Sequence, residues 1–398
     1  MRVTLVEFSP AGGLFHFAMQ LAEGLAELGH EVQLVTGSDP EMLPRHAGVR
    51  LLPLLPTWHP GAARLEPWLL RKARRAVRAL RYVESWRRLA RHLAADPPDV
   101  VQWAEWRFVL DGWAVAALAR RRDAPIQAVV AHTPRPFSEQ RSRGSLHKSG
   151  RLTMSALRSA YAAMDVVLVL GDTARDDVRN LWPEVRRVEI VPHGDEGVLV
   201  AAGDLDSAGR SAEMVLFFGT LARYKGLDVL LDAWPLVRRH RPAARLVIAG
   251  APADVDVAEL RRRVAATAGV ELQVGYVPIG GVGSLMGQAR VVVAPYLLAY
   301  GSGVVALAHT CRRPVVASAV GDLGAAVHDG ETGLLVPPGS APALADALTT
   351  LLADPDQADR LGQAGSARLR ADASWRDIAG SVAAIYTELL RARGGAAG

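Results

Sequence analysis

The sequence is poor in cysteine and in long apolar runs. Its 398 residues include one cysteine, Cys311, which excludes a disulfide within the chain and is typical of a reducing compartment. No stretch approaches the roughly 18 unbroken apolar residues of a membrane-spanning helix. The opening "MRVTLVEFSP" carries one arginine, and its apolar run ends at Glu7, which is too short for a signal peptide. These absences predict a cytoplasmic protein.

A strong excess of one charge is also missing. The chain holds 46 Lys and Arg against 41 Asp and Glu, and half of its residues are hydrophobic. Its length exceeds what one hydrophobic core usually serves, so we expect two domains, each with a core of its own.

Nine short apolar runs alternate with longer segments of helical periodicity. Such alternation is typical of parallel sheets covered by helices on both faces. Residues 200–212 are small and polar without periodicity, which predicts a linker. The sequence therefore predicts an α/β fold of two doubly wound, Rossmann-like domains facing a central cleft, at residues 1–200 and 213–373. The nine runs are residues 3–8, 31–36, 99–103, 126–130, 165–170, 214–218, 245–250, 289–294 and 314–318.

In sheets of this kind, ligands bind at the loops that follow the strands. Gly12 and Gly13 stand between the first strand and a helix, where the backbone and the helix N-terminus can approach an anion; a tight turn is the alternative. His132 stands where another strand ends. His193 and Asp195, in "VPHGD", follow a third strand, and an ordinary capped turn explains them equally well.

The second half begins with the strand, loop and helix "FFGTLARYKGLDVLLDAW", residues 217–234. Arg223 and Lys225 stand on this loop, and two cations beside a helix N-terminus suit a diphosphate. A solvated surface lysine is the alternative for Lys225. Further backbone N–H donors to the same phosphates are expected in a later Gly-Ser-Gly turn, at Ser302, Gly303 and Val304.

Six segments in order resemble the family 4 glycosyltransferases of GT-B architecture. They are "GG…GHEV", "VPHGD", "FGTLARYKGLDVLL", "SGVVALA", "PVVASAVGDL" and "DGETGLLVPPGS", and the resemblance runs from residue 1 to about 390. It implies transfer of a sugar from a nucleotide-diphosphate sugar with retention of anomeric configuration, without a bound metal or other cofactor.

The resemblance also implies roles for particular residues. Gly13 would approach the donor diphosphate, His132 would contact the donor sugar, and Lys225 would pair with the phosphates. The backbone at Tyr276 and Val277 would hold the base. The other implied donor-binding residues are Gly12, His193, Asp195, Gly219, Thr220, Tyr300, Ser302, Gly303 and Val304.

The chain departs from the family pattern at three positions. Two glutamates that many members use to orient the donor sugar and ribose fall on Ala299 and Leu307. The arginine that usually follows the strand glycine is Thr220, and Arg223 is the candidate replacement. These departures leave the identity of the donor sugar nucleotide undetermined.

No side chain stands out as a covalent nucleophile. The implied mechanism is attack by an acceptor hydroxyl on the face that the diphosphate leaves, with Arg223 and Lys225 stabilising the departing charge. The products would belong to bacterial cell-envelope glycans, glycolipids or secondary metabolites. Two alternatives stay open. One is a non-catalytic GT-B partner subunit. The other is a sugar-nucleotide epimerase, although the sequence shows no carboxylate cluster for the acid/base steps of such an enzyme. The acceptor is expected near Trp58, His59, Glu105 and Arg135.

Two helical segments invite separate interpretations. Residues 68–93 hold nine Lys and Arg and one acid, Glu84. This charge fits either a solvated helix face or a peripheral contact with the inner face of an anionic membrane. Nucleic acid is not expected, because no nucleic-acid reader motif accompanies the charge. Residues 374–392 have an apolar stripe, which by the resemblance crosses back to the N-terminal domain beside a hinge at 195–212. Packing on its own domain is the alternative.

Overall fold

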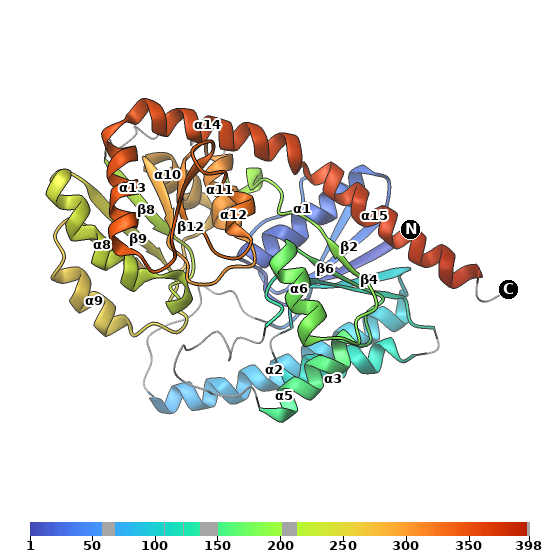
Figure 1. Ribbon diagram of the computed structural model, residues 1–398. Helices are drawn as coiled ribbons and strands as arrows, with labels where there is room; N and C mark the ends of the chain where they lie inside the picture. The colour runs from blue at the N-terminus through green and yellow to red at the C-terminus, as the bar shows by residue number, and fades with distance from the viewer. Residues whose placement is uncertain (58–67, 107, 122, 136–149, 201–212, 396–398) are drawn as a thin grey trace. The chain divides into compact units, whose positions relative to one another are not determined.

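The structure is a computed structural model that describes residues 1–395 except 58–67, 107, 122, 136–149 and 201–212. The chain divides into two compact units. Unit 1 comprises Met1–Pro192 and Trp375–Gly398, and unit 2 comprises His193–Ser374. Each contains one parallel sheet with helices packed against it, which confirms the predicted α/β fold class (Figure 1).

The sheet of unit 1 has seven parallel strands in the order β3-β2-β1-β4-β5-β6-β7. Val3, Leu5 and Val6 of β1 are almost completely buried, as expected for a central strand with helices on both faces. The strands are β1 (Arg2–Val6), β2 (Glu31–Gly37), β3 (Val49–Leu55), β4 (Val100–Trp103), β5 (Ile126–Ala131), β6 (Val166–Val169) and β7 (Val188–Ile190).

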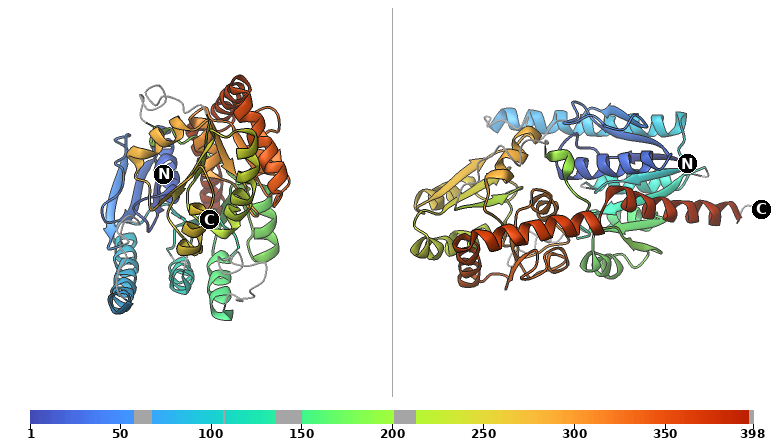
Figure 2. Two further views of the ribbon diagram at one scale, coloured as in Figure 1. Left: turned by 90° about the vertical axis from the view of Figure 1, so that its left-hand side faces the viewer. Right: turned by 90° about the horizontal axis from the view of Figure 1, so that it is seen from above.

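Helices cover both faces of this sheet. In Figures 1 and 2, α1 (Gly13–Glu27) and α15 (Trp375–Gly395) lie on one side. On the other side lie α2 (Trp68–Ala95), α3 (Val109–Ala119) and α5 (Arg151–Tyr161). The unit also contains α6 (Asp172–Leu181), between β6 and β7.

The last helix, α15, packs against α1 within unit 1. Gly24 permits this, because a side-chain carbon there would stand 2.6 Å from the Trp375 carbonyl oxygen and 2.9 Å from Ala379 Cβ. Further along α15, the buried Tyr386 hydroxyl donates to Gln102 Oε1 at 2.5 Å. The residues that α15 buries are Ile378, Ala379, Val382, Ala383 and Tyr386.

The sheet of unit 2 has six parallel strands in the order β10-β9-β8-β11-β12-β13. They are β8 (Met214–Phe218), β9 (Arg245–Gly250), β10 (Val270–Val274), β11 (Val291–Ala294), β12 (Val315–Ser318) and β13 (Gly333–Val336). Here α8 (Leu227–His240) packs against α13 (Ala341–Ala353), and α11 (Gly303–Thr310) packs against α14 (Pro355–Asp372). The remaining helices are α9 (Val257–Ala265), α10 (Ile279–Gln288), α12 (Leu323–Ala326) and the 3₁₀ turns η2 (Gly197–Leu199) and η3 (Arg223–Lys225).

All nine apolar runs form strands, but the sequence-based set was incomplete. The structure adds β3, β10 and β13, while β7 is the strand that was expected before Pro192 outside the nine runs. In the described part of the chain, no helix is long and apolar enough to cross a membrane.

Candidate functional site: two switch points and a buried lysine

Each sheet has a point where the strand order reverses. In unit 1 this point lies between β1 and β4, and in unit 2 it lies between β8 and β11. Loops at the carboxyl ends of such neighbouring strands leave a crevice in which doubly wound folds bind ligands. The predicted residues Gly12 and Gly13 follow β1, whereas Gly219 and Lys225 follow β8.

In unit 2, Lys225 closes the loop that begins at Gly219. Gly219 has φ 104°, a backbone conformation that favours glycine. A side-chain carbon on Gly219 would stand 3.1 Å from Lys225 Nζ and 3.3 Å from Val304 Cγ2. Next in the chain, Gly226 (φ 71°) lies so near Pro295 that a side-chain carbon there would overlap its carbonyl oxygen. The loops after β8 and β11 therefore pack closely and bring Lys225 beside the start of α11.

Lys225 is a buried cation. Its side chain is 8% exposed, and Nζ lies 5.2 Å from the centroid of the Tyr296 ring. Burial lowers the pKa of Lys225, but the hydroxyl groups of Tyr296 and Tyr224 outweigh it, and the net pKa lies above its ordinary value. Among the described residues, no carboxylate forms an ion pair with this ammonium. A buried charge without a counter-charge is costly, so the position suits an anionic ligand.

The N-terminus of α11 lies beside this lysine. Ser302 is the N-cap, and its Oγ accepts a hydrogen bond from Val305 N. Helix N-termini present unpaired backbone N–H groups and a partial positive charge. The N–H groups of Gly303 and Val304 therefore add to the positive potential around Lys225.

His193 and Glu196 meet at the same helix end. A side-chain carbon on Gly303 would stand 3.0 Å from His193 Nε2 and 3.4 Å from Glu196 Oε1. His193 Nε2 lies 3.5 Å from Glu196 Oε1. Burial lowers the pKa of His193, although its hydrogen bond to the Gly194 carbonyl and the charge of Asp195 oppose this shift. The lowered pKa favours the neutral imidazole of His193, which lies against the side chain of Glu196, a residue that is 2% exposed.

The sequence-based reasoning missed Glu196. The residue directly follows "VPHGD", and Thr310 of α11 accepts a hydrogen bond from its backbone N–H. The signal that could have pointed to Glu196 as a binding residue is an acid at the end of a segment that otherwise reads as a turn. The predicted helix start at residue 302 has no acid of its own. The positions where many family members carry glutamates, Ala299 and Leu307, are buried in the apolar core of unit 2.

Arg223 does not accompany Lys225 into the interior. It is exposed; its backbone N–H donates to Asp254 Oδ1 at 2.9 Å and its Nε donates to the Asp254 carbonyl oxygen at 3.2 Å. Thr220, the other loop position singled out, is also exposed. Lys225 is thus the buried cation of this loop.

The remaining predicted donor residues of unit 2 follow strands of the same sheet. Tyr276 and Val277 come just after β10, where Gly275 N donates to the Gly250 carbonyl at the end of β9. With strands about 4.8 Å apart, the end of β10 lies roughly 10 Å from the end of β8. Tyr300 is 5% exposed in the loop after β11, and Asp195 Oδ1 accepts from Gly197 N.

In unit 1, Glu41 holds the glycine loop. Gly12 (φ 88°) donates its N–H to Glu41 Oε2 at 3.3 Å, and His16 Nε2 lies 2.9 Å from the same oxygen. Glu41 N also donates to the Pro10 carbonyl at 2.8 Å. Side-chain carbons on Gly12 and Gly13 would meet no atom within 4 Å. Glu41 therefore fixes the loop, while the space into which side chains of Gly12 and Gly13 would project is open.

His132 follows β5 and lies against α1. The centroid of its ring is 4.8 Å from that of Phe17 in an edge-on arrangement, and the Phe17 ring is 5.0 Å from that of Trp375, at the start of α15. The histidine is only partly exposed. Its orientation is thus set by a series of edge-to-face aromatic contacts that reaches the last helix.

The structure separates the four acceptor-side candidates. Trp58 and His59 lie outside the described residues. Arg135 donates from Nε and Nη2 to Asp177, both at 2.6 Å, so its guanidinium anchors the loop after β5 to α6. Glu105 lies near the buried Tyr161, whose pKa is raised by burial and, second, by the charge of Glu105.

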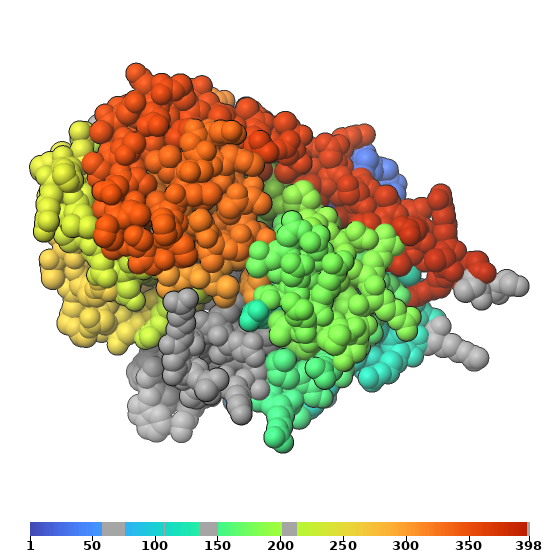
Figure 3. Space-filling view, in the orientation of Figure 1, coloured from blue at the N-terminus to red at the C-terminus, as the bar shows by residue number. Residues whose placement is uncertain are grey.

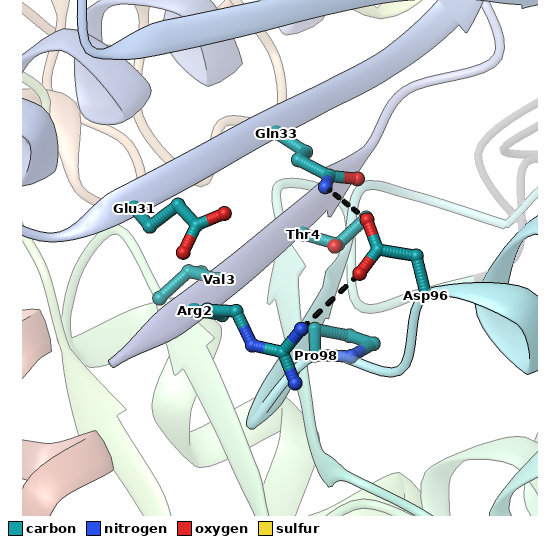
Figure 4. A pocket seen from close by; sticks show the side chains of 7 residues that line it. All are labelled: Arg2, Val3, Thr4, Glu31, Gln33, Asp96 and Pro98. Carbon is teal, nitrogen blue, oxygen red and sulfur yellow. Dashed lines mark hydrogen bonds and ion pairs between the residues drawn. The ribbon is translucent and has the colours of Figure 1, made fainter.

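A small polar pocket lies at the opposite, amino-terminal edge of the unit 1 sheet. Figure 4 shows Arg2 and Gln33 pointing to Asp96, which accepts from Arg2 Nη1 at 3.1 Å and from Gln33 Nε2 at 2.7 Å. The Gln33 hydrogen bond chiefly holds the pKa of Asp96 below its usual value, against a small effect of burial. This carboxylate is already satisfied and tethers the end of α2. Among the described residues, no cluster of His, Cys, Asp or Glu is suited to hold a metal ion.

Comparison with known proteins identifies the family. Residues 11–194 match the profile described as Glycosyltransferase Family 4, and residues 212–354 match the one described as Glycosyl transferases group 1. The chain is 30% identical over 326 residues to alpha-maltose-1-phosphate synthase of Mycobacterium tuberculosis, covering 74% of this chain and 80% of that one. The chain belongs to this family of glycosyltransferases, which are retaining enzymes that use nucleotide sugars.

Solved structures show the same fold. Sucrose-phosphate synthase from Thermosynechococcus elongatus superposes with a TM-score of 0.74 at 23% identity, covering 98% of this chain and 99% of that one. The Anabaena protein Alr3699/HepE, in complex with UDP-glucose, superposes with a TM-score of 0.67 at 15% identity, covering 98% and 100%. The fold of this chain is therefore GT-B, as the sequence predicted.

Proposed function

We propose that the protein transfers a sugar from a nucleotide-diphosphate sugar to an acceptor hydroxyl, and that unit 2 binds the donor through Lys225 and the N-terminus of α11. The observation that carries this proposal is the buried ammonium of Lys225, which has no carboxylate partner among the described residues and stands at a switch point. A donor diphosphate supplies the missing negative charge. The UDP-glucose in the Anabaena relative supports a donor of this class.

The chemistry follows from charge that develops on the departing diphosphate. Lys225 stays protonated through the neutral range, because its pKa lies above the ordinary value. Together with the N–H groups of Gly303 and Val304, it stabilises this charge as the anomeric C–O bond breaks. The acceptor hydroxyl attacks on the face that the diphosphate leaves, and the diphosphate takes its proton.

Other residues take supporting roles in this proposal. His132 contacts the donor sugar, Gly13 lets the backbone approach the diphosphate, and the backbone at Tyr276 and Val277 holds the base. Arg223 contributes only if donor binding draws its guanidinium away from Asp254. Glu196, whose Oε1 would stand 3.4 Å from a side-chain carbon on Gly303, is our candidate to accept from a sugar or ribose hydroxyl.

The acceptor belongs to the chemistry of bacterial cell-envelope glycans, glycolipids or glycosylated secondary metabolites. The mycobacterial relative is named alpha-maltose-1-phosphate synthase, which supports an acceptor of the carbohydrate class. A non-catalytic partner subunit is less well supported, because such a subunit would have no reason to keep a buried, uncompensated lysine.

Turnover with a panel of donors tests the proposal. The protein is incubated with UDP-, GDP-, ADP- and dTDP-sugars, and release of free nucleotide is measured with and without candidate acceptors. Nucleotide release from one donor class, lost in Lys225→Ala, is the expected result. Binding without turnover across the panel would favour the partner subunit instead.

A further inference from the structure

Three helices of unit 1 form one layer on the sheet, which we call the α2–α3–α5 layer. Asp111 of α3 ties α2 to it by accepting from Tyr82 Oη at 2.5 Å and from Trp86 Nε1 at 3.0 Å. On its other side, Gly112 lets α5 approach, since a side-chain carbon there would stand 2.4 Å from the Ala156 carbonyl oxygen. Figures 1 and 2 show the three helices side by side. The layer therefore has one continuous outer face.

Large apolar side chains gather on this layer. Leu80 is 72% exposed on α2, Trp113 is 49% exposed on α3, and Leu152 is 60% exposed on α5. The amino-terminal end of α5 forms the lowest part of the green surface in Figure 3. Exposed apolar side chains that cluster, rather than occur singly, mark interaction surfaces. In the described residues nine large hydrophobic side chains are exposed, and six are in or next to this layer: Val77, Leu80, Val83, Phe108, Trp113 and Leu152.

The charge around these side chains is predominantly positive. From Val77 to Ala95, helix α2 carries five arginines and one acid, Glu84. Arg87 and Arg91 follow Leu80 by seven and eleven residues, so they share its face of the helix. Arg151 stands next to Leu152 on α5 and is exposed. Glu84 accepts from both Arg88 and Arg91, so it offsets only part of this charge.

We propose that the outer face of the α2–α3–α5 layer docks on a bilayer surface that carries anionic lipid headgroups. Leu80, Trp113 and Leu152 enter the boundary between headgroups and acyl chains, while the arginines reach the headgroup phosphates. Charge complementarity selects this occupant: a second copy of the chain would set arginine against arginine. The docking does not rest on the transferase reaction, because none of these side chains belongs to the donor site.

Flotation with vesicles tests the docking. The full chain is mixed with vesicles of phosphatidylcholine alone, or of equal parts phosphatidylcholine and phosphatidylglycerol. Binding to the anionic vesicles only is expected, and it should weaken as salt rises. Arg87→Gln and Arg91→Gln should each reduce partitioning about fivefold, and the double variant Leu80→Ser/Trp113→Ser should lower it further.

Matched substitutions elsewhere control for lost hydrophobicity and charge. Leu43→Ser, on the loop between β2 and β3, and Arg239→Gln, on α8, change exposed side chains outside the layer. Their vesicle binding should match that of the unchanged protein. All these positions are exposed, so thermal melting should be unaffected, which separates docking from folding. Absence of binding to anionic vesicles, or equal binding by the layer variants, would overturn the proposal. So would a dimer that the Leu80→Ser/Trp113→Ser variant dissociates.

Discussion

Lys225 and Tyr296 hold each other in place across the switch point of unit 2. The ammonium lies 5.2 Å from the ring centroid, and the two residues follow the neighbouring strands β8 and β11. The backbone joins the same two loops, because Leu297 N donates to the Tyr224 carbonyl at 2.7 Å. An aromatic face stabilises a cation without neutralising it. The lysine is thus fixed in position while its charge stays available to a ligand.

Replacing Lys225 tests the role of this charge in turnover. Lys225→Ala should lower kcat/KM by about 100-fold, as when a donor to developing charge is removed. Arg239→Ala removes an exposed cation from the far end of the following helix and should leave kcat/KM unchanged. A loss below threefold in a folded Lys225→Ala protein would contradict the assignment.

His132 is expected to act on the sugar and not on the nucleotide. His132→Ala should therefore reduce kcat while leaving the dissociation constant of the nucleoside diphosphate nearly unchanged. Steady-state kinetics and calorimetric titration measure the two quantities. If turnover is lost and the dissociation constant of the nucleoside diphosphate rises with it, the histidine acts by supporting Phe17 and Trp375, the neighbours that its loss would disturb.

The buried His309 should make unit 2 sensitive to acid. Burial chiefly lowers its pKa to about 4 from 6.5, although the hydrogen bond to the Thr332 carbonyl opposes this. The unfolded chain binds the proton more readily, so stability is full above pH 6.5 and falls as the pH drops toward the folded pKa. By about pH 5 this costs about 2 kcal/mol of unfolding free energy.

Calorimetry of His309→Asn tests whether His309 causes this loss of stability at acidic pH. The thermal transition of the variant should fall less between neutral pH and about pH 5 than that of the unchanged protein. His240→Asn, an exposed histidine at the end of α8, should behave like the unchanged protein. Parallel pH profiles for all three proteins would show that His309 does not titrate as described.

Helix α15 should be required for the stable folding of unit 1. Truncation after residue 373 removes the buried face of α15 and uncovers α1, so the shortened chain should bind hydrophobic dyes and lose activity. Tyr386→Phe is a milder test: it leaves Gln102 without its hydrogen bond and should cost about 1–3 kcal/mol. Arg391→Ala, on the exposed side of α15, is the control. Normal turnover by the truncated chain would refute this account.

The sequence predicted the interior of both sheets better than their edges. The nine apolar runs correspond to the nine strands that have a neighbour on each side, and β3, β7, β10 and β13 are the four edge strands. Interior strands are buried on both faces and read as unbroken apolar runs. Edge strands such as β10, "VELQV", alternate with exposed residues and carry a weaker signal.

The candidate site was predictable in part for a similar reason. A lysine between a strand glycine and a helix is visible in one segment, so Lys225 could be found from local pattern alone. Glu196 meets Gly303 from more than 100 residues away, and only the fold brings them together. Arg223 was placed beside Lys225 by proximity in sequence, but the 3₁₀ turn η3 directs one inward and leaves the other exposed.

The central claim is that Lys225 binds the diphosphate of the donor, and calorimetric titration tests it most directly. UDP, GDP, ADP and dTDP, together with the unphosphorylated nucleosides, are titrated into the unchanged protein and into Lys225→Met. We expect one nucleoside diphosphate to bind and Lys225→Met to weaken it at least about tenfold, as for the loss of a charged hydrogen bond, with the nucleoside unaffected. Equal diphosphate affinity in the two proteins would contradict the account.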